Sequence, residues 1–109
     1  MLKKKKYLQS GFYCHQSVEK ILKAYFWFIK REEPPYSHNL LKISKESGLD
    51  RQFNEKQKRL IDLLMPLNIE ARYPEEKLSI MKTLDNSKAE TIFNEPGVIV
   101  KWIQELMTQ

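Results

Sequence analysis

The sequence predicts an all-α protein: a single domain over residues 1–109, folded as an antiparallel up-and-down bundle of four to five helices. Three observations support this prediction. Apolar residues recur in steps of three and four along most of the chain, as in amphipathic helices. Capping and helix-breaking residues separate these segments. No alternation of apolar and polar residues is long enough to build a sheet.

The first predicted helix runs from Tyr7 to Arg31, and we expect the basic residues 1–6 before it to be frayed. From Tyr25 to Ile29, consecutive apolar residues cover nearly the whole circumference of this helix. A helix that is apolar all round must be covered all round. In a chain of only 109 residues we expect the second cover to come from another subunit, so this segment predicts a homodimer.

Two shorter helices are predicted after the pair Pro34-Pro35, which cannot continue a helix. We expect Ser37 to cap the second helix and Gly48 to end it. Asn54 is expected to cap the third helix. Pro66 falls late in the apolar stripe of that helix and predicts a kink or an end there.

The last helix is expected to begin at Ser87, because Ser87 and Glu90 have the spacing of a capping box. Its apolar residues run from Ile92 to Leu106. The stretch over residues 94–97, Asn-Glu-Pro-Gly, interrupts them, so we expect either one kinked helix or two pieces.

Composition excludes several classes of protein. The only cysteine, Cys14, cannot form an intrachain disulfide, which excludes a secreted disulfide scaffold and favours a reducing cytoplasm. The longest apolar run, from Ala24 to Ile29, is far shorter than the roughly 20 residues of a membrane span. We therefore expect a cytoplasmic protein that has no membrane partner.

The net charge of +5 would fall to +1 without Lys3 to Lys6. This cluster is interpreted either as a solvated chain end or as a patch that attracts the phosphates of a nucleic acid. In the second interpretation, Lys5 and Lys6 are candidate phosphate contacts.

No metal and no cofactor are expected. The only histidines are His15 and His38, and the chain has no Cys-x-x-Cys or His-x-x-x-His pair. Three scattered glycines form no phosphate-binding loop. Cys14 is interpreted as a small apolar residue on the core side of the first helix rather than as a nucleophile.

Two groups of residues around the first helix are candidates for chemistry. His15 and Glu19 lie four residues apart on one helix face and can touch, either as an internal polar pair or as a functional one. His38 is expected in the first turn of the second helix. Arg31 and His38 could act together on a phosphodiester, the guanidinium stabilising charge and the imidazole moving a proton. The alternative is that His38 only anchors its loop.

Arg72 and Tyr73 form a third candidate group, with Asn68 and Glu70 beside them. The guanidinium matches a phosphate and the phenol ring can stack on a base. The alternative is a buried ion pair between Arg72 and Glu70 that fixes the turn.

Three segments resemble HEPN-domain proteins. Residues 12–24 contain His-Gln-x-x-Glu-Lys, residues 33–40 contain Pro-Pro-x-x-His, and residues 66–74 contain Glu-Ala-Arg-Tyr-Pro. Trp102-Ile103 in the last helix fits as well. The segments span nearly the whole chain in the right order, so the combination is fairly specific.

The resemblance implies an up-and-down helical bundle that forms homodimers, is often encoded beside a minimal nucleotidyltransferase, and binds nucleotides or RNA. Many relatives are RNase toxins with an Arg-x(4–6)-His motif at a dimer cleft. Arg72 looks like that arginine, but Lys77, Leu78 and Ser79 occupy the permitted positions of the histidine. Family members usually carry a full helix before the segment resembling Leu2 to Tyr7, and we expect at most its last turn here.

We therefore expect a nucleotide- or RNA-binding HEPN module that is non-catalytic by itself and works with a minimal nucleotidyltransferase in a toxin–antitoxin-like pair. Its nucleotide and phosphate contacts would be Arg72, Tyr73, Asn68, Lys5 and Lys6. One alternative is a metal-independent RNase toxin, for which the candidate catalytic residues are His38, Arg31 and His15. A further alternative is a structural dimerisation domain.

Overall fold

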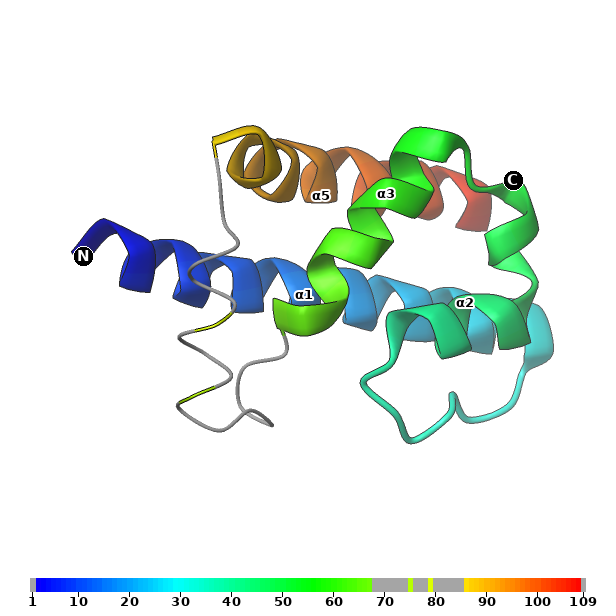
Figure 1. Ribbon diagram of the computed structural model, residues 1–109. Helices are drawn as coiled ribbons and strands as arrows, with labels where there is room; N and C mark the ends of the chain where they lie inside the picture. Colours follow the sequence, from blue (N-terminus) through cyan, green and yellow to red (C-terminus); the bar gives the residue numbers. More distant parts are fainter. Residues whose placement is uncertain (1, 68–74, 76–78, 80–85, 109) are drawn as a thin grey trace.

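The computed structural model describes residues 2–67, 75, 79 and 86–108. These residues contain four α-helices, two short 3-10 helices and no strand (Figure 1). The elements are α1 (Leu2–Lys30), α2 (Leu40–Ser47), η1 (Leu49–Gln52), α3 (Glu55–Leu64), η2 (Met65–Leu67) and α5 (Asn86–Met107). The predicted all-α helical bundle is confirmed.

The long helix α1 is the element on which the others are assembled. Figure 1 shows α5 beside α1, α3 crossing back over them, and α2 against the second half of α1. α1 begins at Leu2, so residues 2–6, which we expected to be frayed, are helical. Leucine and lysine are both good helix formers, which accounts for the earlier start.

The core lies where these helices meet. Val18 and Leu22 of α1 are completely buried and belong to one apolar cluster with side chains from α2, α3, α5 and the two 3-10 helices. The buried partners are Leu40, Ile43, Leu49, Phe53, Leu60, Ile61, Leu64, Leu67, Ile92, Ile99 and Ile103. Burial of side chains of this size stabilises a fold by roughly 1.5–3 kcal/mol each.

The aromatic run of α1 is covered on one side only. Tyr25 and Phe26 are buried within the chain, but Trp27 remains 51% exposed and Ile29 46% exposed. α1 therefore keeps part of the apolar surface for which the sequence predicted a second cover. No helix in the described ranges is both long and apolar enough to cross a membrane.

The short helices are set by local capping. Asn39, not Ser37, caps α2: its side chain accepts the backbone N–H of Lys42, while the Ser37 hydroxyl accepts the N–H of Asn39. The predicted Ser37 cap is therefore wrong by two residues. Asn54 caps α3 as predicted, in a reciprocal capping box with Gln57.

Pro66 and Pro96 have different effects on their helices. α3 ends at Leu64, just before Pro66, as predicted. α5 continues through Pro96 as one helix. The sequence had left open one kinked helix or two pieces, and two pieces are excluded. α5 is already helical at Asn86, so Ser87 lies inside the helix and the predicted Ser87 cap is wrong.

Two glycines test whether backbone conformation or packing governs these positions. Gly48 ends α2 with φ +79°, whereas Gly97 lies inside α5, and an added Cβ would contact nothing within 4 Å at either. We expect Gly48→Ala to lower the free energy of unfolding by about 1 kcal/mol, because a side chain disfavours left-handed backbone. Gly97→Ala should raise it by about 0.5–1 kcal/mol, because alanine favours helix. Urea unfolding followed by circular dichroism measures both; changes of the same sign would contradict the assignment.

Candidate functional site

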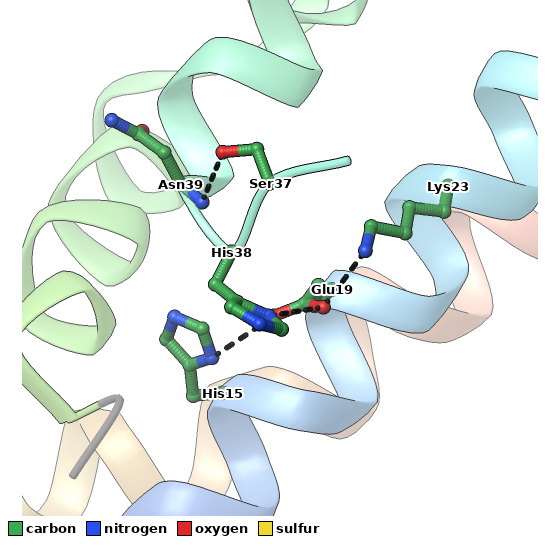
Figure 2. Close-up of polar contacts among 6 residues, drawn as sticks. All are labelled: His15, Glu19, Lys23, Ser37, His38 and Asn39. Atoms are coloured by element: carbon green, nitrogen blue, oxygen red, sulfur yellow. Dashed lines mark hydrogen bonds and ion pairs between the residues drawn. The ribbon is translucent and has the colours of Figure 1, made fainter. Parts of the chain in front are cut away.

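Glu19 is the centre of a polar cluster where α1 meets the chain before α2 (Figure 2). Steps of four residues place His15, Glu19 and Lys23 on one face of α1. Lys23 Nζ lies 3.0 Å from Glu19 Oε2, and His15 Nδ1 lies 3.7 Å from Glu19 Oε1. His15 is completely buried, and Glu19 is 9% exposed. The predicted contact between His15 and Glu19 is thus confirmed, at ion-pair rather than hydrogen-bond distance.

His38 reaches Glu19 from the loop between α1 and α2. Its Nδ1 lies 2.9 Å from Glu19 Oε2 and 3.1 Å from Oε1. The hydrogen bonds of Ser37 and Asn39 fix the backbone on either side of His38. The sequence predicted His38 in the first turn of the second helix. This prediction is wrong, because α2 begins only at Leu40 and His38 precedes it.

The Glu19 carboxylate is held in its charged form. Burial by itself would raise its pKa, but hydrogen bonds from His38 and Lys23, together with their positive charges, hold the pKa below its usual range. The carboxylate therefore stays ionised at neutral pH and fixes the position of both basic groups.

The orientation of His38 determines what chemistry the cluster can perform. A carboxylate can only accept, so the proton in this hydrogen bond is assigned to His38 Nδ1. The second ring nitrogen, Nε2, is left for other contacts, and 67% of the His38 side chain is exposed. An imidazole held by a carboxylate at one nitrogen can bind a phosphate or move a proton with the other.

Arg31 is not brought to this cluster. Its guanidinium stacks on Trp27 and Phe28, at 4.8 and 5.6 Å from their ring centroids. Trp27 follows Glu19 by eight residues, or about 12 Å along a helix axis. Within one chain the structure therefore separates Arg31 from His38 and pairs His38 with Glu19 instead.

The other candidate contacts are placed only in part. Asn68, Arg72 and Tyr73 lie outside the described residues. Lys5 and Lys6 belong to α1, but their side chains are outside the described part. No cluster of three or more His, Cys, Asp or Glu suited to a metal occurs in the residues that the structure places.

Cys14 is half-buried and packs against the core cluster, as expected for a small apolar residue. Burial raises the pKa of its thiol, which disfavours the nucleophilic thiolate.

The pairing of Glu19 with His38 was missed from the sequence, because the two residues are nineteen positions apart. The available signal was that both belong to the segments that carried the family resemblance. His-Gln-x-x-Glu-Lys supplies His15 and Glu19, and Pro-Pro-x-x-His supplies His38. The fold joins these two motifs through one carboxylate.

Comparison with known proteins agrees with the fold and with these motifs. The family model described as HEPN domain matches residues 1–106, which include every element described above except the last residue of α5. No curated protein and no solved structure matches the chain.

Glu19→Gln tests the electrostatic role of the carboxylate. At neutral pH we expect the variant to be less stable by about 1–3 kcal/mol, because the hydrogen bonds from His38 and Lys23 lose their charged acceptor. A carboxylate whose pKa is lowered on folding stabilises the protein above its unfolded-state pKa of about 4.3. This contribution is lost as the pH falls through the lower folded-state pKa.

The difference in the free energy of unfolding between the wild type and Glu19→Gln should therefore become smaller in acid. Denaturant unfolding between about pH 3 and 7 measures it, with Glu105→Gln, an exposed position on α5, as control. A gap that stays constant over this range would show that the Glu19 charge does not contribute.

Proposed function

The chain belongs to the HEPN family, and from this premise we propose that it is a nucleotide- or RNA-binding helical module. The observation that carries the proposal is the exposed His38 ring, fixed by the buried Glu19 carboxylate with Lys23 beside it. The Lys23 ammonium is a donor that suits phosphate oxygens, and the Nε2 atom of His38 is a second such donor whenever both ring nitrogens carry a proton.

The charge of α1 supports a polyanionic ligand. This helix contains seven lysines and a single acidic residue, Glu19, which is already engaged by His38 and Lys23. Four of the lysines, residues 3–6, belong to the N-terminal cluster. Such a helix attracts phosphates electrostatically without depending on their sequence.

The module is proposed to work in the cytoplasm as a homodimer, beside a minimal nucleotidyltransferase in a toxin–antitoxin-like pair. The family resemblance supports the partner, and the exposed Ile29 and Val98 side chains support a further protein contact. Arg72, Tyr73 and Asn68 are proposed to bind the nucleotide. A non-catalytic role is favoured because the histidine expected after Arg72 is replaced by Lys77, Leu78 or Ser79.

A metal-independent RNase is the second candidate, and one observation favours it. The Glu19–His38 pair has the arrangement of a carboxylate that orients a general acid–base histidine. In this version His38 moves the proton and Arg72 stabilises the phosphate, in one chain or across a dimer.

Binding is tested by fluorescence anisotropy with labelled nucleotides and with a single-stranded RNA of about eight nucleotides. We expect binding that weakens with salt. His38→Ala should weaken it about tenfold, since hydrogen bonds to charged groups contribute about 1.5–3 kcal/mol. Lys101→Ala, at an exposed position on α5, is the control. Absence of binding at low salt would reject the proposal.

Catalysis is tested by incubating RNA with the wild type, His38→Ala and Arg72→Ala in the presence of a chelator. If the chain is an RNase, His38→Ala should cleave about 100-fold or more slowly, which is the contribution typical of a general acid–base group. Equal cleavage by all three proteins would identify a contaminant and end the RNase interpretation.

A further inference from the structure

The exposed face of α1 has a composition that the core does not require. Between Tyr13 and Trp27 the solvent-facing positions at helical spacing are Tyr13, Ser17, Lys20, Ala24 and Trp27. Tyr13 is 67% exposed and Trp27 51% exposed. The face therefore has an aromatic ring near each end, a lysine between them, and no acidic residue.

Arg31 is held over one end of this face. Its guanidinium lies 4.8 Å from the centroid of Trp27, and its backbone N–H donates to the Trp27 carbonyl at 2.8 Å. The guanidinium is thus stacked on an indole that is still half exposed. We name this pair the Trp27–Arg31 shelf.

The backbone of Arg31 has an energetically unfavourable conformation for the end of a helix. Arg31 has φ +57°, and it is the only residue other than glycine with a positive φ in the described ranges. α2 ends in the same left-handed region with Gly48, which avoids the steric cost. At the end of α1 an arginine occupies this strained conformation, and its side chain makes two aromatic contacts.

We propose that the Trp27–Arg31 shelf is a stacking site for a base of single-stranded RNA. Indole rings and guanidinium planes are the groups on which proteins stack unpaired bases, without the need for a particular sequence. The phosphates next to that base would lie toward Lys20 and Lys23. The inference rests on the proposed RNA-binding function, but the shelf is a site distinct from the Glu19–His38 cluster.

The geometry also sets the direction of the strand. Glu32 and Glu33 directly follow Arg31 and repel phosphate on the loop side. The strand therefore runs from the shelf back along α1, toward Lys20. Trp27 and Glu19 are about 12 Å apart along the axis, so one strand can touch both the shelf and His38.

A second copy of the chain fits this face less well than RNA does. In a two-fold symmetric contact centred on this face, Tyr13 of one protomer would meet Trp27 of the other. Lys20 is seven residues from each, so it would lie at the axis against its own copy. Like charges in direct opposition disfavour that contact, whereas a phosphate between the aromatic residues is favourable.

The test uses the full chain with Trp102→Phe, which leaves Trp27 as the only tryptophan. Titration with an unlabelled single-stranded RNA of about eight nucleotides should quench the Trp27 fluorescence as a base stacks. Trp27→Ala should weaken binding, measured by anisotropy, at least about fivefold, and Trp27→Phe should restore most of it.

Arg31→Gly separates binding from folding. Glycine relieves the positive φ, which offsets the loss of the contacts with Trp27 and Phe28, so the variant should be about as stable as the wild type while it binds RNA about fivefold or more weakly. Arg59→Ala, which removes one exposed arginine from α3, is the charge-matched control and should bind more tightly than Arg31→Gly.

Three outcomes would contradict the proposal that the Trp27–Arg31 shelf binds RNA. If the wild type binds RNA and the Trp27 and Arg31 variants bind it equally well, the shelf is wrong and the RNA-binding function stands. If the wild type binds no RNA, both proposals fail. If the variants lose affinity only because a dimer dissociates, as shown by sedimentation, the face is an interface between copies of this chain.

Discussion

Much of this structure depends on one carboxylate that must be satisfied at the edge of an apolar interface. Glu19 lies between the core residues Val18 and Leu22, where an unpaired charge would be costly. Its own helix supplies Lys23, and the loop before α2 supplies His38. The requirement to neutralise Glu19 therefore fixes where this loop crosses α1, and with it the approach of α2 to the core.

The same constraint explains why the candidate site is ordered although His38 is largely exposed. An exposed histidine on a loop would usually sample many rotamers. Here the Glu19 oxygens hold one ring nitrogen, and hydrogen bonds of Ser37 and Asn39 hold the backbone on both sides. A binding or proton-transferring group is thereby preorganised by the fold, which lowers the cost of contacting a ligand.

The parts of the fold that the sequence predicted are those governed by local physics. Apolar residues at steps of three and four identified the four α-helices of the described ranges, and Asn54, Gly48 and Pro66 marked boundaries for reasons that involve only nearby backbone. Errors arose where two local solutions compete. Ser37 and Asn39 are both good caps, and the sequence alone does not show that the loop carries His38 to Glu19 before the helix begins. That contact joins two residues nineteen positions apart, and no periodicity of the sequence predicts such a contact.

α1 has three faces with different roles. One face builds the core and one edge carries the charged cluster. Its exposed positions from Tyr13 to Lys30 present lysines and aromatic rings, with no acidic residue, to solvent. A purely structural helix would be expected to balance its lysines with acidic residues at i+4 spacing, because such pairs stabilise an exposed helix. Here the single acid of α1 is already used by His38 and Lys23, so this helix offers no acidic partner to its other lysines. Lysines without an acidic partner on their own helix stabilise it less than paired lysines would, and a polyanionic ligand is the partner that would use both these charges and the exposed aromatic rings.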